Sequence, residues 1–463
     1  MASIAHLRRL PRSMMVLYDR HRWVHHCVRS VGKLGSSMSR PIAFDATHVV
    51  SRLVVERPSG IDKVDLLYLE HFARDRCSTA VHYGLTAPRF HDAKTLPQLS
   101  ALATADRWSG GELENDRAFA RVLSAVAGIA AAHVPANERP AKRQVANRWQ
   151  RRATQIVWRL SRGRSTLPEG AIYLNVAQHV FENHRFFTWL DHRRDVVPVF
   201  MVHDLLPLDY PEFFRPGYKT RFERRFATIS RYARALIVAS ASVADRVRHE
   251  YRTRGLTPVP IWVAPLPSPL SAKREEQQFD AVLARHPYFL MVGTIEPRKN
   301  HLLVLNSWRR IAEDHPHPPK LVIVGGRGWE NEQVLDVLDR SDIVRPHVVE
   351  VAGITDAGLA MLLRNARAAL VPSFAEGYGL PIVEALSFGT PVLASNIAVF
   401  KEVGQDRCQY IHPIDGPGWR QAILDLCNAN HPRAIQARTA AQSFCPPDWT
   451  AYFEGVDDFL RAL

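Results

Sequence analysis

Short apolar runs alternate with helical patterns along most of this 463-residue chain, and no other feature constrains its fold as much. Strand-like runs occur within residues 41–55, 79–85, 171–175, 196–203, 235–239 and 261–264, and again within 288–292, 320–324, 348–352, 368–371 and 391–394. Helical spacing separates most of them, for example over residues 300–314. Continuous apolar strands joined by helices are typical of parallel sheets covered on both faces. We therefore predict an α/β fold.

A proline-rich stretch divides the two series of strands. The five prolines at 258, 260, 265, 267 and 269 cannot continue a helix and favour extended chain, as in an interdomain linker. A chain of 463 residues exceeds what one core usually holds, and 46% hydrophobic residues can build two. We expect two Rossmann-like domains facing each other, over residues 41–268 and 269–447. A basic extension (1–40) precedes them, and a helix (448–463) capped by Asp448 follows.

The segment from Glu376 to Glu384, with the sequence EGYGLPIVE, follows one of these apolar runs and is expected to form a ligand site. Gly377 and Gly379 allow the backbone to approach a ligand closely. Pro381 suits the first position of a helix, whose free N–H groups would point at the crevice above the strand. With Glu384 in the first helical turn, both carboxylates would flank one ligand. The alternative is a solvated loop followed by an ordinary helix start.

The segment resembles the Glu-x7-Glu motif of retaining glycosyltransferases of family four, which have the two-domain GT-B fold. Residues 292–300 and 321–329 resemble that family's donor-diphosphate segment and its second strand and loop, and residues 353–356 continue the same order. The resemblance implies that the final helix crosses back to the first domain and that a nucleoside-diphosphate sugar is the donor. The implied donor-binding residues are Gly293, Thr294, Gly325, Gly326, Gly377, Tyr378, Gly379, Leu380 and Glu384.

Two adjacent cations, Arg298 and Lys299, are the candidates for stabilising the departing diphosphate. The family often has an arginine near the position of Thr294, so whether Arg298 takes that role stays open. The resemblance implies that Glu376 contacts the donor sugar and that Glu384 holds ribose hydroxyls. Retention would then follow from front-face attack, with the donor phosphate taking the acceptor proton. We expect no cofactor and no metal ion, because the chain has no Asp-x-Asp motif and cationic side chains take the place of a divalent ion.

The first domain contributes two further candidate sites. Ligands of open α/β sheets bind outside the carboxyl ends of the strands, which indicates His203 and Asp204. They resemble a His-Asp-x-x-Pro loop of a bacterial branch of the family, in which the histidine lies near the donor sugar; the alternative is a strand cap and a turn. By its position, the loop of Gly60, Ile61, Asp62 and Lys63 matches the family's glycine loop for acceptor and donor phosphate.

The formal net charge of +14 favours an acidic partner. Within an insertion at about residues 134–168, the segment from Arg139 to Arg164 carries nine Lys or Arg residues and no acid, with Trp149 and Ile156 near one side of a helix. That side of the helix either binds an anionic membrane surface or packs on the protein's own domain, and the sequence favours neither. Neither a membrane-spanning stretch nor a secretory signal is recognisable, so we expect a cytoplasmic protein, peripheral on the inner face of the cytoplasmic membrane if the segment binds lipid.

These observations together predict a hexosyltransferase. We expect it to move a sugar from a nucleoside-diphosphate sugar to a glycan or lipid-linked glycan in the synthesis of surface polysaccharide such as lipopolysaccharide. Mannose, from GDP-mannose, is an expectation by analogy alone. The alternatives are another GT-B enzyme, such as a sugar-nucleotide epimerase, and a non-catalytic protein that binds membrane or nucleic acid. Standard nucleic-acid motifs are lacking, which argues against a nucleic-acid partner.

Overall fold

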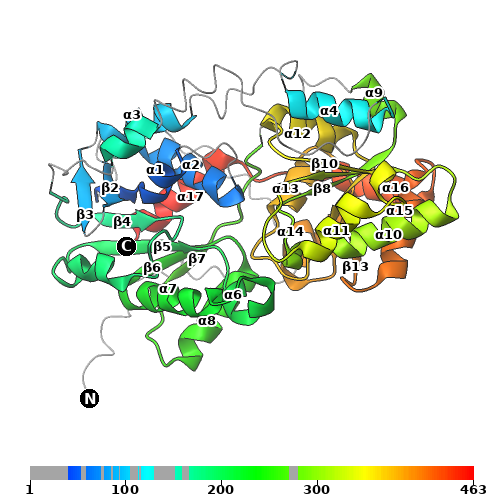
Figure 1. Ribbon diagram of the computed structural model, residues 1–463. Helices are drawn as coiled ribbons and strands as arrows, with labels where there is room; N and C mark the ends of the chain where they lie inside the picture. The colour runs from blue at the N-terminus through cyan, green and yellow to red at the C-terminus, as the bar shows by residue number, and fades with distance from the viewer. Residues whose placement is uncertain are drawn as a thin grey trace. The chain divides into compact units, whose positions relative to one another are not determined.

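The computed structural model describes residues 40–53, 59–74, 78–84, 87–92, 94–104, 113, 116–129, 152–158, 166–270 and 280–463. The basic extension before Arg40 and most of the segment 139–164 lie outside these ranges. The predicted α/β fold is confirmed, because the described residues form two sheets covered by helices (Figure 1).

The first sheet has seven strands in the order β3-β2-β1-β4-β5-β6-β7, all parallel except for the edge strand β3, which runs antiparallel to β2. In chain order its strands are β1 (Ile42–Asp45), β2 (Thr79–Tyr83), β3 (Pro88–His91), β4 (Ile172–Asn175), β5 (Val197–Val202), β6 (Ala235–Val238) and β7 (Ile261–Val263). Its helices include α1 (Thr47–Arg52), α2 (Gly60–Phe72), α3 (Thr95–Thr104), α6 (Leu206–Asp209), α7 (Tyr218–Tyr232) and α8 (Ala241–Thr253), with 3-10 turns η3 (His184–Asp191) and η4 (Pro211–Phe213). The carboxyl ends of its central strands therefore meet at one edge.

The second sheet has six parallel strands in the order β10-β9-β8-β11-β12-β13. Its strands are β8 (Tyr288–Val292), β9 (Lys320–Val324), β10 (Val348–Val351), β11 (Ala368–Val371), β12 (Val392–Ser395) and β13 (Gln409–Ile411). Its helices are α9 (Ala281–Arg285), α10 (His301–Asp314), α11 (Glu332–Arg340), α12 (Asp356–Asn365), α13 (Leu380–Ser387), α14 (Ala398–Gly404), α15 (Gly416–Cys427) and α16 (Pro432–Gln442), with 3-10 turns η5 (Pro297–Lys299), η6 (Arg345–His347) and η7 (Gln405–Arg407). Successive strand residues belong to different cores, as with Phe289 and Leu290, so both faces of this sheet are buried.

One predicted strand is wrong in extent. The apolar run over residues 41–55 was expected to be extended, but the strand ends at Asp45 and the chain turns into α1. The Asp45 carboxylate accepts a hydrogen bond from the backbone N–H of Thr47 at 2.9 Å, which fixes this turn. Val49 and Val50 are buried on the helix instead. A short apolar run does not distinguish a buried strand from a buried helix, and here both share one run.

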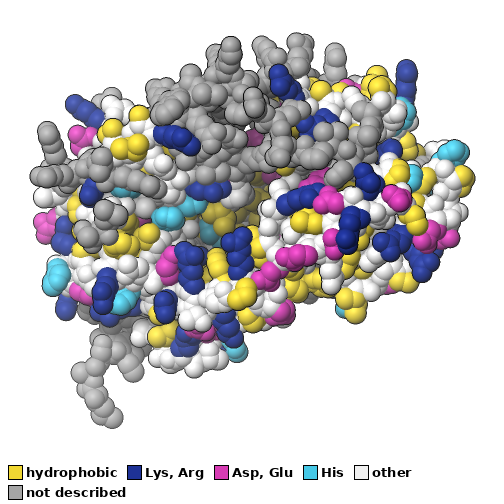
Figure 2. Space-filling view, in the orientation of Figure 1, with side chains coloured by type: hydrophobic (Ala, Val, Ile, Leu, Met, Phe, Trp, Pro, Cys, Tyr) yellow, Lys and Arg dark blue, Asp and Glu magenta, His cyan; other side chains and the backbone are white. Residues whose placement is uncertain are grey.

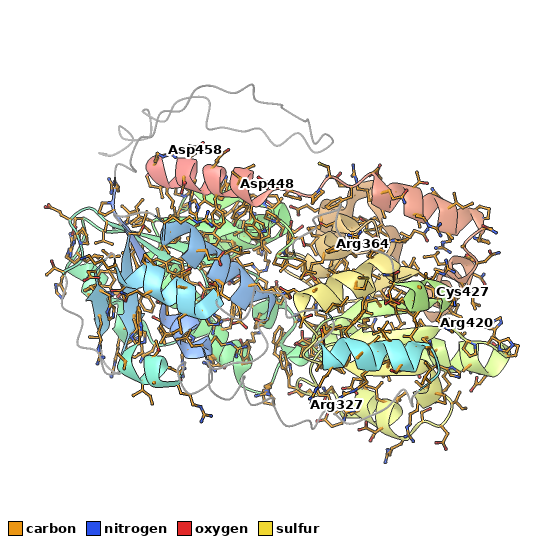
Figure 3. All side chains as sticks on the ribbon, turned by 90° about the horizontal axis from the view of Figure 1, so that it is seen from above. Arg327, Arg364, Arg420, Cys427, Asp448 and Asp458 are labelled. Atoms are coloured by element: carbon orange, nitrogen blue, oxygen red, sulfur yellow. The ribbon has the colours of Figure 1, made fainter. Side chains whose placement is uncertain are left out.

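The final helix, α17 (Trp449–Arg461), packs against elements of the first sheet, which confirms the predicted crossover (Figure 1). Asp448 caps it by accepting from the backbone N–H of Ala451, and Figure 3 shows Asp448 and Asp458 toward its two ends. The hydroxyls of Tyr68 and Tyr452 lie 2.7 Å apart, and the rings of Trp262 and Phe459 stack at 5.8 Å. These aromatic contacts hold the end of the chain on the first domain.

Helix α4 (Arg117–Val126) packs with the second sheet although it lies within the range expected for the first domain (Figure 1). Phe119 and Val122 share a core with Val322 and Val349. The buried Asp116 caps α4 through the N–H of Phe119 at 2.9 Å, and its other oxygen accepts from Thr355, at 2.8 Å from the N–H and 2.7 Å from the hydroxyl. The domain boundaries 41–268 and 269–447 stay predictions, and this helix is a second link between the two halves of the sequence.

Because Asp116 serves both α4 and Thr355, its loss should destabilise the fold. We expect Asp116→Ala to lower the free energy of unfolding by about 2–4 kcal/mol, of which about 1 kcal/mol is the helix cap and the rest the unpaired polar groups of Thr355. Urea-induced unfolding measures this. The matched control is Asp280→Ala, since Asp280 caps α9 through Val282 and Leu283, and the substitution should cost about 1 kcal/mol. Equal losses in the two variants would contradict the bridging role of Asp116.

Candidate active site

The loop between β11 and α13 holds the central residues of the predicted site. Gly379 has φ +110°, a left-handed conformation, and acts as the N-cap of α13. The helix therefore begins at Leu380, one residue earlier than expected, with Pro381 as its second residue. Glu384 consequently lies beyond the first turn, and the prediction that placed it there is wrong. Glu384 still lies near charged groups of the site, since Lys63, Asp356 and Lys299 all act on its carboxyl group.

Glu376 lies at the centre of an ion-pair cluster. Its two oxygens contact Lys299 Nζ and Arg298 Nη1, each at 2.5 Å, and the hydroxyl of Ser373 donates to it at 3.0 Å. Arg298 also contacts Glu296 at 2.7 Å. Burial by itself raises the pKa of Glu376, but the neighbouring Arg298 and Lys299 outweigh it and lower that pKa to about 2. The carboxylate is therefore ionised at neutral pH, and it holds both cations in place.

Two glycine loops support Lys299, and their glycines have different roles. Gly293 has φ +144°, and the Lys299 side chain passes 3.4 Å from where a Cβ would stand. A Cβ on Gly325 would lie 1.9 Å from the Gly293 carbonyl oxygen, so packing between the loops requires Gly325. A Cβ on Gly326 would meet no described atom within 4 Å. Thr294 is exposed at the surface of the same loop.

This difference makes Gly326 a test of ligand approach. If the donor diphosphate lies against this loop, Gly326→Ala should leave the melting temperature unchanged and raise the KM for the donor roughly tenfold, because the added methyl group would meet only the ligand. Melting curves and initial rates measure both. The control is Gly416→Ala, whose Cβ also meets no described atom within 4 Å. An unchanged KM in both variants would exclude Gly326 from the donor site.

The first domain contributes His203 and Asp204 to the same place. A Cβ on Gly377 would lie 2.4 Å from the carbonyl oxygen of His203 and 2.8 Å from Asp204 Cβ, and the Ser240 hydroxyl donates to the Gly377 carbonyl at 2.9 Å. The loop after β5 thus lies directly against the loop of Glu376. His203 Nε2 bonds the carbonyl of Val176 at 2.8 Å, so Nε2 carries the proton, and burial lowers the pKa of His203 to about 4. Its neutral ring keeps Nδ1 as an acceptor.

The predicted glycine loop is the start of α2, and it too reaches the second domain. A Cβ on Gly60 would stand 3.0 Å from the side chain of Leu380, and Lys63 pairs with Asp356 at 2.8 Å. Asp62 is instead buried in a capping box with Ser59 and a bidentate pair with Arg52, at 2.9 and 3.0 Å. Asp62 therefore has a structural role in this arrangement. Gly60 and Ile61 are exposed, so their backbone is accessible to a ligand.

Glu384 is buried with few polar neighbours. Burial raises its pKa to about 7; Lys63 and Lys299 oppose this rise, and Asp356 adds to it. No hydrogen bond to its carboxylate is seen among the residues that the structure describes. Tyr378, in contrast, uses its hydroxyl to bond the carbonyl of Leu266 at 2.9 Å, so it anchors the linker. A buried carboxyl group with no hydrogen bond from a described residue is well placed to accept hydroxyl groups of a ligand.

One loop of this edge was not singled out in the sequence. Gln178 and Val180 have φ of 55° and 59°, although neither is glycine, and they flank His179 in the loop after β4. That loop also supplies the Val176 carbonyl to His203. Such strain is typical of functional loops. No sequence signal reveals a left-handed Val, whereas Glu296 and Asp356 lie inside the quoted motifs and were identifiable there as acids.

The basic segment is described only over residues 152–158, which are helical. Gln155 binds the carbonyls of Val50 and Ser51, while Ile156 and Val157 are exposed. On the face drawn in Figure 2, Lys and Arg side chains lie among Asp and Glu side chains. Within the described ranges, no helix is long and apolar enough to cross a bilayer. The membrane surface stays a prediction.

A family match and two solved structures indicate the class of protein to which this chain is similar. Residues 273–410 match the family described as glycosyl transferases group 1. The fold resembles that of sucrose-phosphate synthase from Thermosynechococcus elongatus, with a TM-score of 0.54 at 15% identity over 91% of this chain and 98% of that one. It also resembles the N-terminal domain of Candida albicans trehalose-6-phosphate phosphatase, with a TM-score of 0.53 at 12% identity over 94% and 99% of the two chains. The predicted GT-B fold is thereby confirmed.

Among individual proteins, the chain is similar to mannosyltransferases. It is 32% identical to the serotype-specific mannosyltransferase WbdA of Escherichia coli, over 51% of this chain and 31% of that protein. It is 36% identical to O-antigen chain mannosyltransferase B of Escherichia coli, over 35% of this chain and 42% of that protein. It is 28% identical to O-antigen chain mannosyltransferase RfbU of Salmonella typhimurium, over 49% of this chain and 59% of that protein. The matches thus span about a third to three fifths of these relatives. The resemblance read from the motifs is confirmed to this extent: residues 273–410 match the glycosyl transferases group 1 family, and the chain is similar to mannosyltransferases over part of their length.

Proposed function

We propose that the protein is a retaining hexosyltransferase that works without a metal ion. It would transfer mannose from GDP-mannose to a glycan or lipid-linked glycan during synthesis of surface polysaccharide. The observation that supports this most directly is the cluster of Arg298, Lys299 and Glu376 at the carboxyl end of the second sheet, directly against His203 of the first. Two fixed cations beside a glycine loop suit a departing diphosphate.

The chemistry follows from this placement. The acceptor oxygen bonds to the anomeric carbon on the face from which the diphosphate leaves, the broken C–O bond leaves its electron pair on the diphosphate, and the acceptor proton passes to a phosphate oxygen. Arg298 and Lys299 stabilise the negative charge that develops there. Glu376 contacts the sugar, and Glu384 accepts the ribose hydroxyls. The neutral His203 offers Nδ1 to a sugar hydroxyl.

The names of the relatives support the choice of sugar and acceptor, since O-antigen mannosyltransferases recur among them. A peripheral position on the inner membrane face would bring the protein to a lipid-linked acceptor, and no nucleic-acid partner is proposed. The nucleotide sugar is a co-substrate, and no cofactor is required.

A thermal-shift screen tests the donor. GDP, UDP and their sugars are added to the full chain, and a ligand at 100 times its Kd should add about 2.7 kcal/mol of stability. We expect GDP and GDP-mannose to raise the melting temperature. Stabilisation by uridine compounds alone would overturn the donor assignment, and no stabilisation by any of them would overturn the proposed function.

A further inference from the structure

A column of three aromatic rings leads from the first domain to the candidate active site. The rings of Tyr210 and Phe213 stack at 6.0 Å with 24° between their planes, and those of Phe213 and Phe374 at 5.5 Å with 15°. Phe374 lies in the loop between β11 and α13, two residues before Glu376. Tyr210 and Phe213 lie at the 3-10 turn η4, which helix α6 connects to His203 and Asp204. The column therefore joins the two loops that meet at the proposed reaction centre.

Backbone contacts hold the column in place. The indole N–H of Trp329 donates to the carbonyl of Phe213 at 3.1 Å, and the N–H of Phe374 donates to the carbonyl of Arg298 at 2.8 Å. The Arg215 guanidinium lies 5.8 Å from the centre of the Trp329 ring. The inner ring, Phe374, is thus tied to Arg298, and the middle ring, Phe213, to the loop that follows β9. The column is a fixed surface and not a set of independent side chains.

The outer end of the column faces solvent. Tyr210 is 41% exposed, while Phe213 and Phe374 are half-buried, and within the described ranges Phe213 is the one aromatic ring stacked on Tyr210. Glu212 and Arg215 are exposed on the same turn. The turn thus presents a large flat ring with a polar tip next to charged groups. The contact between Phe213 and Phe374 already joins the two domains. Joining the domains therefore does not explain why the ring of Tyr210 extends the column into solvent.

We propose that the ring of Tyr210 is a platform for a pyranose ring of the acceptor glycan, beyond the sugar that receives the new residue. A pyranose has an apolar face of C–H groups and a rim of hydroxyls, which matches an aromatic ring that carries a hydroxyl at its tip, with the exposed Glu212 and Arg215 on the same turn. The position of the platform, along the column from Phe374, directs a glycan from solvent toward Glu376. This inference rests on the proposed function, because it names the acceptor of that same site.

Binding measurements test the platform without requiring turnover. Linear α-mannose oligosaccharides of one, two and four residues are titrated by calorimetry into the full chain with GDP present. We expect the tetrasaccharide to bind more tightly than mannose, and Tyr210→Ala to weaken the tetrasaccharide roughly tenfold while leaving mannose unchanged. Tyr210→Phe should restore most of the affinity. The matched control is Phe214→Ala, since the ring of Phe214 stacks on Tyr218 at 5.5 Å, on the same turn but outside the column.

The outcomes separate the two proposals. Equal tetrasaccharide affinity in wild type and Tyr210→Ala, or no oligosaccharide binding by wild type at all, overturns the platform. An equal loss in Phe214→Ala overturns it too, because the effect would then belong to the whole turn. If the tetrasaccharide binds as expected but no sugar is transferred from any donor tested, the platform stands and the proposed transferase function fails.

Discussion

Replacing Lys299 by alanine should lower kcat for sugar transfer roughly 100- to 1000-fold. Lys299 Nζ contacts Glu376 at 2.5 Å, and its stem lies along Gly293, so the ammonium group is fixed before the donor arrives. A preorganised charge of this kind acts on the negative charge that forms on the diphosphate and loses nothing to reorientation. The KM for the donor should change less than kcat, because the charge is larger in the transition state than in the ground state. Initial rates with GDP-mannose measure both constants.

Folding has to be separated from catalysis in this variant. Without Lys299, the buried Glu376 keeps Arg298 as a partner, and its pKa should rise from about 2 toward its ordinary value. We expect the melting temperature at neutral pH to fall by a few degrees only, and Lys299→Arg to recover part of kcat. Arg310→Ala is the control: Arg310 is an exposed cation of α10 paired with Glu313, and its loss should change neither quantity. A folded Lys299→Ala variant with kcat within threefold of wild type would remove Lys299 from the mechanism.

Much of the second domain was predictable because its strands are buried on both faces. The run Ala368–Val371 matches β11 at both ends, since four small apolar residues before a proline have few other solutions. The edge strands β3 and β13 were not predicted. Their residues are mostly half-buried and lack a continuous apolar run, so hydrophobic patterning does not reveal them. The extent of β1 was misjudged for the related reason that helix α1 continues its apolar run.

The loops of the site were predictable from their motifs, but their pairings were not. Gly325 and Gly326 are equivalent in sequence, yet only Gly325 is required by a neighbouring carbonyl. Asp62 belongs to a loop expected to bind ligand, and only its contacts with Arg52 and Ser59 show its structural role. A contact between the two domains, such as that of Lys63 with Asp356, depends further on how the two sheets pack. Local propensity carries no information about that arrangement.

Glu384 should make donor binding depend on pH. Burial raises its pKa to about 7, so its carboxyl group is largely protonated at pH 6 and largely ionised at pH 8. An ionised carboxylate accepts both ribose hydroxyls, whereas the protonated form loses part of that capacity. We expect the affinity for GDP-mannose to rise several-fold from pH 6 to pH 8. GDP-mannose is the appropriate probe, because the terminal phosphate of GDP itself titrates near pH 6. Glu384→Ala should weaken binding roughly 10- to 100-fold at pH 8.

In the protein without ligand, ionisation of Glu384 should have the opposite effect: it should lower the free energy of unfolding as pH rises. Its pKa is higher in the folded state than in the unfolded state, so the folded state binds the extra proton, and stability falls as pH rises from about 4.5 through about 7. The variant Glu384→Gln cannot ionise, so relative to wild type it should gain of order 1–3 kcal/mol between pH 5 and pH 8. It should also bind GDP-mannose with little pH dependence. Parallel pH profiles for wild type and Glu384→Gln, in both unfolding and binding, would show that Glu384 is not the titrating group.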